Sequence, residues 1–85
     1  MSTLPVVAQP LMKKAGANTE RELADILFKK MREEHKYLTE VTAEYDVKNQ
    51  TIRNWLNRNY GDEYLATRRQ VDNYWLKQIL NKMRA

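Results

Sequence analysis

The chain has 85 residues, with 15 basic and 11 acidic side chains, a formal net charge of +4, no cysteine and a single histidine, His35. This length suits one small domain with a modest core. The lack of cysteine excludes a disulfide framework and a thiolate metal site, and one histidine excludes a multi-histidine metal site. No apolar run approaches the length of a membrane span, and no basic leader precedes an apolar run at the start. We therefore expect a soluble cytoplasmic protein without a membrane partner.

The charges are unevenly distributed along the chain. Residues 20–46 carry five basic and eight acidic side chains, whereas residues 48–85 carry eight basic and three acidic ones. A basic stripe of this kind attracts phosphate and releases counterions. The alternative is a solvated surface that is rich in basic residues.

Residues 1–17 are expected to form a flexible N-terminal arm. Pro5 and Pro10 interrupt the segment, and a single helical turn could start at Pro10, run through Leu11–Ala15 and stop at Gly16.

The next helix is expected to begin at Thr19. Thr19 and Glu22 have the spacing of a capping box, in which each side chain bonds the backbone N–H of the other. We expect His35 to be a structural residue at the end of this helix. An apolar stripe at helical spacing should supply most of the core, and it consists of Leu23, Ile26, Leu27 and Met31, with Phe28 on its flank.

The stretch from Leu38 to Leu56 is organised as two helices joined by a short corner. The first helix, capped by Thr39, should run over Glu40–Tyr45, and the second from about Asn49 to Asn59, ending before Gly61. The apolar residues face inward, and they are Val41, Tyr45, Val47, Ile52, Trp55 and Leu56. The outward residues include amides and a guanidinium but no carboxylate, and they are Lys48, Asn49, Gln50, Arg53, Asn54 and Asn57.

This stretch resembles the helix-turn-helix motif of phage regulators and of the amino-terminal domains of insertion-sequence transposases. The family's core positions match Val41, Tyr45, Val47, Ile52 and Trp55, and its common threonine matches Thr51. Two positions depart from the family pattern. Thr42 stands where alanine is usual, and Asp46 stands where the corner usually has glycine, although aspartate tolerates the left-handed backbone required there.

The last helix should begin at Asp62 and continue to the end of the chain. Its apolar arc covers roughly half the circumference, and Arg68 and Asp72 lie four residues apart within that arc, in position to pair. We expect the distal part to pack on another copy of the chain, giving a homodimer or higher oligomer. The alternative is a monomer in which the helix folds back on the first helix. The expected interface residues are Trp75, Ile79, Leu80 and Met83.

The predicted fold is therefore all-α, with a compact helix-turn-helix core of three helices over residues 18–61 and a long C-terminal helix over residues 62–85. No phosphate-cradling glycine loop, nucleophile elbow or histidine-centred acid–base pair is present. We expect no catalysis, no cofactor, no metal and no small-molecule substrate.

The leading hypothesis is sequence-specific binding of double-stranded DNA by a small transcriptional regulator of phage or mobile-element origin. The resemblance places six residues toward the bases in the major groove: Lys48, Asn49, Gln50, Arg53, Asn54 and Asn57. The residues expected at the DNA backbone are Thr39, Thr51, Arg58, Arg68 and Arg69. Lys13 and Lys14 either join them or belong to a loosely attached tail in which Leu4, Val6 and Val7 cap the core.

Two alternatives remain. Within the same chemistry, the chain could be the DNA-recognition component of a packaging or transposition complex. From another class, it could be a helical protein-interaction adaptor or inhibitor, which the outward Glu40 and Glu44 and the wide apolar last helix favour.

Overall fold

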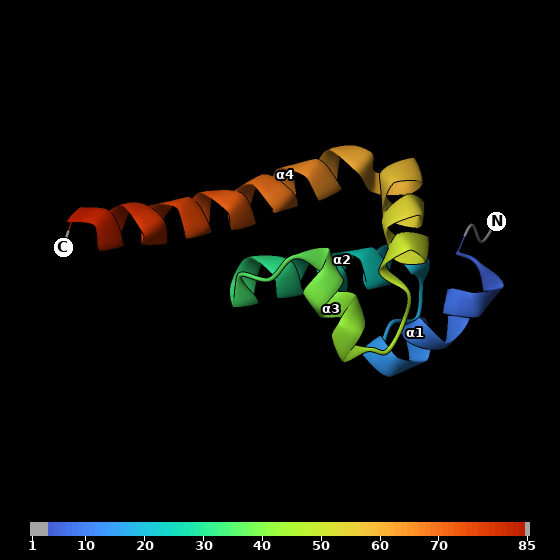
Figure 1. Cartoon of the computed structure of the whole chain (residues 1–85). Helices are drawn as coiled ribbons and strands as arrows, with labels where there is room; N and C mark the ends of the chain where they lie inside the picture. The colour runs from blue at the N-terminus through green and yellow to red at the C-terminus, as the bar shows by residue number, and fades with distance from the viewer. Residues whose placement is uncertain (1–3, 85) are drawn as a thin grey trace.

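The computed structural model describes residues 4–84, with the backbone alone at Val7. In this range the chain is all-α, as expected, and no strand is present. The elements are a short 3-10 helix η1 (Val6–Ala8) and the helices α1 (Gln9–Ala15), α2 (Glu20–Glu34), α3 (Leu38–Glu44) and α4 (Asn49–Arg84) (Figure 1).

The long helix α4 is bent at Tyr60, where φ is −139° and ψ is 39°. We call residues 49–59 the first arm and residues 61–84 the second arm. The helix predicted from about Asn49 to Asn59 was expected to end before Gly61, and this end corresponds to the bend. Arg21 of α2 contacts the bend residue and the second arm. Its guanidinium lies 5.2 Å from the centroid of the Tyr60 ring and forms two hydrogen bonds to the Glu63 carboxylate, of 2.7 and 3.0 Å.

The N-terminal segment differs from the expected flexible arm, although the first three residues of that arm lie outside the described range. Leu4, Ala8 and Leu11 are all buried in the core. The helix of this segment, α1, starts at Gln9, one residue before the expected start at Pro10. It ends as expected at Gly16, whose φ of 78° is left-handed. Tertiary packing therefore holds residues 4–17 on the body of the protein.

Helix α2 is capped as the sequence predicts at its start. The Glu22 N–H donates to Thr19 Oγ1 over 3.1 Å, but the Glu22 carboxylate accepts from the Asn18 N–H rather than from Thr19. At the other end, His35 has a left-handed φ of 56°, and its N–H bonds the Met31 carbonyl. The buried face is shifted relative to the predicted stripe, since Ile26 is only partly buried and the buried residues are Leu23, Ala24, Leu27, Phe28 and Met31.

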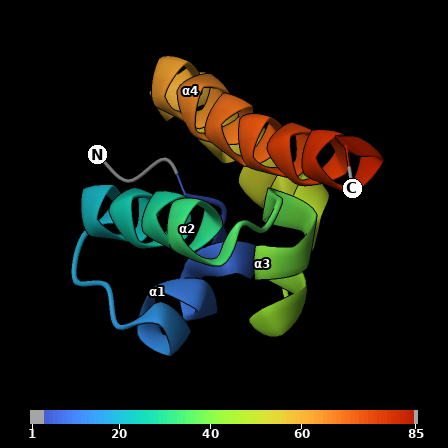
Figure 2. The ribbon, with the colours of Figure 1, turned by 90° about the vertical axis from the view of Figure 1, so that its left-hand side faces the viewer.

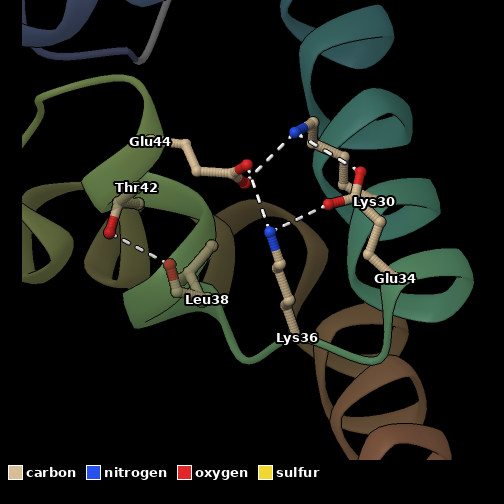
Figure 3. A network of polar contacts seen from close by, with 6 residues as sticks. All are labelled: Lys30, Glu34, Lys36, Leu38, Thr42 and Glu44. Atoms are coloured by element: carbon tan, nitrogen blue, oxygen red, sulfur yellow. Dashed lines mark hydrogen bonds and ion pairs between the residues drawn. The ribbon is translucent and has the colours of Figure 1, made fainter.

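Helix α3 begins at Leu38, two residues earlier than predicted. Its N-cap is Tyr37, whose side chain makes no capping bond, so the predicted role of Thr39 as the cap is wrong. Thr42, which departs from the family pattern, is fully buried. Its hydroxyl donates to the Leu38 carbonyl over 3.0 Å, so the buried polar atom is satisfied within the helix (Figure 3).

Helix α2 lies at the centre of the fold, with α1 on one side and the second arm of α4 on the other (Figure 2). The molecule is elongated, 50 × 24 × 20 Å, because the second arm extends past the body (Figure 1). This arm buries Tyr64, Thr67 and Val71 near its start. Its distal apolar side chains are all exposed: Trp75, Leu76, Ile79, Leu80 and Met83.

Three contacts hold the middle of the second arm against the α2–α3 connection. The Tyr37 hydroxyl donates to the Asp72 carboxylate, the Trp75 indole N–H donates to the His35 carbonyl over 2.9 Å, and the Tyr74 ring meets the His35 ring edge-on. The predicted Arg68–Asp72 ion pair is not formed among the described residues. Asp72 instead accepts from Tyr37, and this contact raises the pKa of the Tyr37 hydroxyl above its usual value of 10.0.

The burial of Leu11 predicts that the N-terminal segment contributes to stability. Leu11→Ala should lower the free energy of unfolding by about 2–5 kcal/mol, because it leaves a cavity under α1. Lys13→Ala, an exposed change in the same helix, should stay within about 0.5 kcal/mol of the parent. Urea unfolding followed by circular dichroism measures both. Equal, small effects would mean that the segment is not part of the core.

Candidate nucleic-acid interface

Helix α3, the corner from Tyr45 to Lys48 and the first arm of α4 form a helix-turn-helix. Asp46 has the left-handed φ of 56° that the corner requires, and Val47 lies partly buried against the core. The Val47 N–H bonds the Thr42 carbonyl over 3.1 Å, which closes the end of α3. The expected use of aspartate in place of glycine is confirmed.

The first arm buries one face and exposes the other. Ile52, Trp55 and Leu56 are buried, with Trp55 only 3% exposed. The Trp55 indole N–H donates to Glu20 Oε1 over 3.1 Å, and the same oxygen accepts the Leu4 N–H. The buried face of the first arm is thereby bound to both α2 and the N-terminal segment.

The exposed face of this arm consists of amides. At 100° per residue, Gln50, Asn54 and Asn57 lie roughly 150° or more from the middle of the buried face, and all three are exposed. Gln50 Nε2 donates to Asn54 Oδ1 over 2.9 Å, so two of these amides are already aligned along the helix. We call these three residues the amide face.

Basic side chains lie on the two edges of the amide face. Arg53 and Arg58, both exposed, lie roughly 110° from the middle of the buried face, on opposite sides. Thr51 and Lys48 lie on the side toward η1, where they line a hollow of about 330 Å³. Of the six predicted base readers, five are thus exposed. Asn49 is the exception: it is partly buried, and its Oδ1 has no hydrogen-bond partner.

Neither a family model, a curated protein nor a solved structure matches this chain. The site therefore has to be judged by its own chemistry.

The residues predicted at the DNA backbone fall into separate places. Thr39 and Arg68 line one hollow together with Arg53, between α3 and the two arms of α4. Thr51 faces the other hollow, toward η1. Arg58 and Arg69 are exposed, and neither lines the hollow that holds Arg53.

One of the two outward carboxylates on α3 is neutralised by lysines. Glu44 accepts from Lys30 Nζ over 3.1 Å and from Lys36 Nζ over 3.2 Å, and both lysines also pair with Glu34 (Figure 3). The hydrogen bonds from Lys30 and Lys36 hold the pKa of Glu44 below its usual value of 4.5. Glu40 is exposed, with no ion pair in the described part of the chain.

The four residues predicted for the oligomer interface lie on the exposed second arm. Ile79, Leu80 and Met83 are more than half exposed, whereas Trp75 is partly committed to its own chain through the bond to the His35 carbonyl. The structure therefore gives Trp75 a role within its own chain, which is to fix the path of the arm.

Two contacts in this region are not indicated by the sequence, and they involve Lys14 and Tyr37. Lys14 Nζ donates to the Tyr45 carbonyl over 3.0 Å, which places α1 at the helix-turn-helix corner. Tyr37 lines the hollow that holds Arg53 and Arg68. Both contacts join segments about 30 residues or more apart, so no local spacing in the sequence indicates them.

Within residues 4–84, no group of three or more acidic, histidine or cysteine side chains is placed to hold a metal ion. None of the described helices combines the length and apolar character that crossing a bilayer would require.

The lowered pKa of Glu44 predicts a pH-dependent contribution to stability. A carboxylate with a folded pKa below the unfolded value stabilises the fold above the unfolded pKa, and this stabilisation is lost as the pH falls through the folded pKa. Glu44→Gln should therefore lower the urea midpoint at pH 7, and the difference from the parent should vanish well below pH 4.5.

The matched control is Glu33→Gln, an exposed change on α2 at a residue without an ion pair in the described range. Glu33→Gln should leave the urea midpoint nearly unchanged, both at pH 7 and well below pH 4.5. If the effect of Glu44→Gln were equally large in acid, its cause would not be the ion pairs with Lys30 and Lys36.

Proposed function

We propose that this chain binds double-stranded DNA sequence-specifically, with the first arm of α4 in the major groove. The observation that carries the proposal is the amide face of Gln50, Asn54 and Asn57, exposed on the second helix of a helix-turn-helix and backed by buried Ile52 and Trp55. In this motif the second helix is the one that enters the groove.

The amide face has the chemistry for reading base edges. Asparagine and glutamine can bond the N6 and N7 positions of adenine bidentately, and each good pair discriminates by about 1–3 kcal/mol. The existing bond between Gln50 and Asn54 holds both side chains in one direction, which lowers the entropy lost on ordering them. A preference for adenine in the bound site follows from this composition.

Basic residues beside the amide face suit the phosphates that border the groove. Arg58 and Lys48 are exposed, and neither forms an ion pair in the described part of the chain. Lys13 and Lys14 lie on α1, which reaches the corner through the Lys14–Tyr45 bond. Contacts of this kind fix the orientation of the protein on the duplex without reading sequence.

A dimer is part of the proposal, because one recognition helix reads only a few base pairs. The distal second arm exposes Leu76, Ile79, Leu80 and Met83 on one side. Pairing two such arms would bury these side chains and place two recognition helices on one DNA molecule. The biological role would be a small transcriptional regulator of phage or mobile-element origin, or the recognition component of a packaging or transposition complex.

The same exposed apolar stripe favours a second candidate function, a helical protein-interaction module. An amphipathic helix that lays its apolar face into a groove of a different protein uses the same kind of surface. Binding to DNA separates the two candidates.

A salt titration with mixed-sequence duplex DNA tests the proposal directly. A protein that contacts about five phosphates should show a slope near −4.5 in a plot of log K against log salt. Fluorescence anisotropy of a labelled duplex measures it. No binding at low salt would contradict the proposal and favour the protein-interaction module.

Base reading is tested with Asn54→Ala on a site selected from random duplexes. The change should weaken binding to that site by about 1–3 kcal/mol and hardly affect mixed-sequence DNA. Asn81→Ala, an exposed asparagine on the second arm, serves as the control and should bind as the parent. An equal loss on both DNAs would assign Asn54 to the backbone.

The dimer is tested by sedimentation equilibrium at tens of micromolar protein. The parent should be a dimer, and Leu80→Glu should be a monomer, because it places a carboxylate in the apolar stripe. Asn81→Glu adds the same charge on roughly the opposite side of the arm and should remain a dimer. A monomeric parent would contradict pairing through this arm.

A further inference from the structure

The structure brings Arg53 and Arg68 together in one hollow of about 280 Å³. Arg53 lies on the first arm of α4 and Arg68 on the second, so the bend at Tyr60 is what lets both residues line the same space. Thr39, on α3, also lines this hollow. The remainder of the lining includes buried apolar side chains of α2, α3 and α4.

The electrostatics of this hollow favour an anion. No carboxylate lines it, and neither guanidinium forms an ion pair in the described part of the chain. Asp72, which accepts the Tyr37 hydroxyl, and Glu40 both act electrostatically on Tyr37, but neither lines the hollow. Two positively charged side chains that line one space repel each other, and an anion between their guanidiniums would convert that repulsion into two charge-assisted interactions.

The polar groups of the hollow can complete such a site. Thr39 offers a hydroxyl donor. Asn49 also lines the wall, and because its Oδ1 has no partner, its amide can rotate to present the NH₂ group. The volume equals the liquid share of about nine water molecules, which accommodates a phosphate group with some solvent but not a nucleotide beside it.

We infer that this hollow, built by Arg53, Arg68 and Thr39, is a phosphate-binding pocket that takes one backbone phosphate of the bound duplex. The identification of the phosphate as a DNA phosphate rests on the proposed function. Arg53 lies at the edge of the amide face, next to the groove wall, where a backbone phosphate would reach it. In this assignment Arg53 contacts the backbone, whereas the sequence placed it toward the bases.

The pocket also joins the two arms of the bent helix. A phosphate held by one arginine from each arm stabilises the bend, since straightening α4 would separate the two guanidiniums. The recognition helix and the second arm are then fixed relative to each other when DNA is bound.

The pocket is tested without DNA, using inorganic phosphate against chloride at constant ionic strength. Nuclear magnetic resonance of the arginine side-chain N–H and backbone amide groups follows the titration. The parent should show saturable shifts at Arg53, Arg68 and Thr39, and either Arg53→Gln or Arg68→Gln should weaken the apparent affinity at least tenfold. Arg58→Gln and Arg69→Gln are the matched controls, exposed on the same two arms but outside the hollow, and should titrate as the parent.

A shift that is linear in phosphate, or an Arg68→Gln variant that titrates as the parent, would overturn the pocket. Both variants replace exposed side chains, and a thermal melt that matches the parent confirms that each remains folded.

The second measurement uses DNA and separates the two proposals. Arg53→Gln and Arg68→Gln should weaken binding to selected and mixed-sequence duplexes by the same factor and reduce the salt slope by about 1 each. A loss confined to the selected site would overturn the backbone role of Arg53. Saturable phosphate binding without any DNA binding would refute the proposed function and leave the pocket in place. DNA binding of unchanged affinity in both arginine variants would overturn the phosphate-binding pocket and leave the proposed function in place.

Discussion

The orientation of the first arm of α4 depends on the burial of Trp55. Its indole occupies the core, and its N–H is satisfied by a carboxylate oxygen of Glu20 that also accepts a backbone N–H of the N-terminal segment. A buried indole with a satisfied N–H allows little rotation of the helix that carries it. The direction in which Gln50, Asn54 and Asn57 point is therefore determined by the contacts of Trp55 on the opposite, buried face of the helix.

The fold was largely predictable where local chemistry determines it. The Thr19 cap, the left-handed Asp46 and the break before Gly61 depend on a few neighbouring residues. The N-terminal segment was not predictable in the same way. Helix α1 has one buried residue, Leu11, so its sequence shows no repeated apolar spacing that would indicate a buried face. Its order comes from tertiary contacts with α2, which short-range patterns do not contain.

The candidate site was likewise predictable only where local spacing determines it. The amide face follows from helical spacing alone, since the residues opposite Ile52 and Trp55 must face outward. The hollow at Arg53 could not be read from the sequence, because Arg68 is fifteen positions further on and reaches it only through the bend. The acceptor of the Trp55 indole N–H could not be predicted either, because Glu20 lies 35 residues away in the sequence.

The bend at Tyr60 has a geometric consequence for any symmetric assembly through the second arms. In such an assembly the angle between the arms, together with the length of the paired segment, sets the distance between the two copies of the first arm. Duplex geometry accepts half-sites only at separations near whole helical turns. In the proposed DNA complex, Arg21, which contacts Tyr60 at the bend and Glu63 on the second arm, would therefore help to set the spacing of the half-sites.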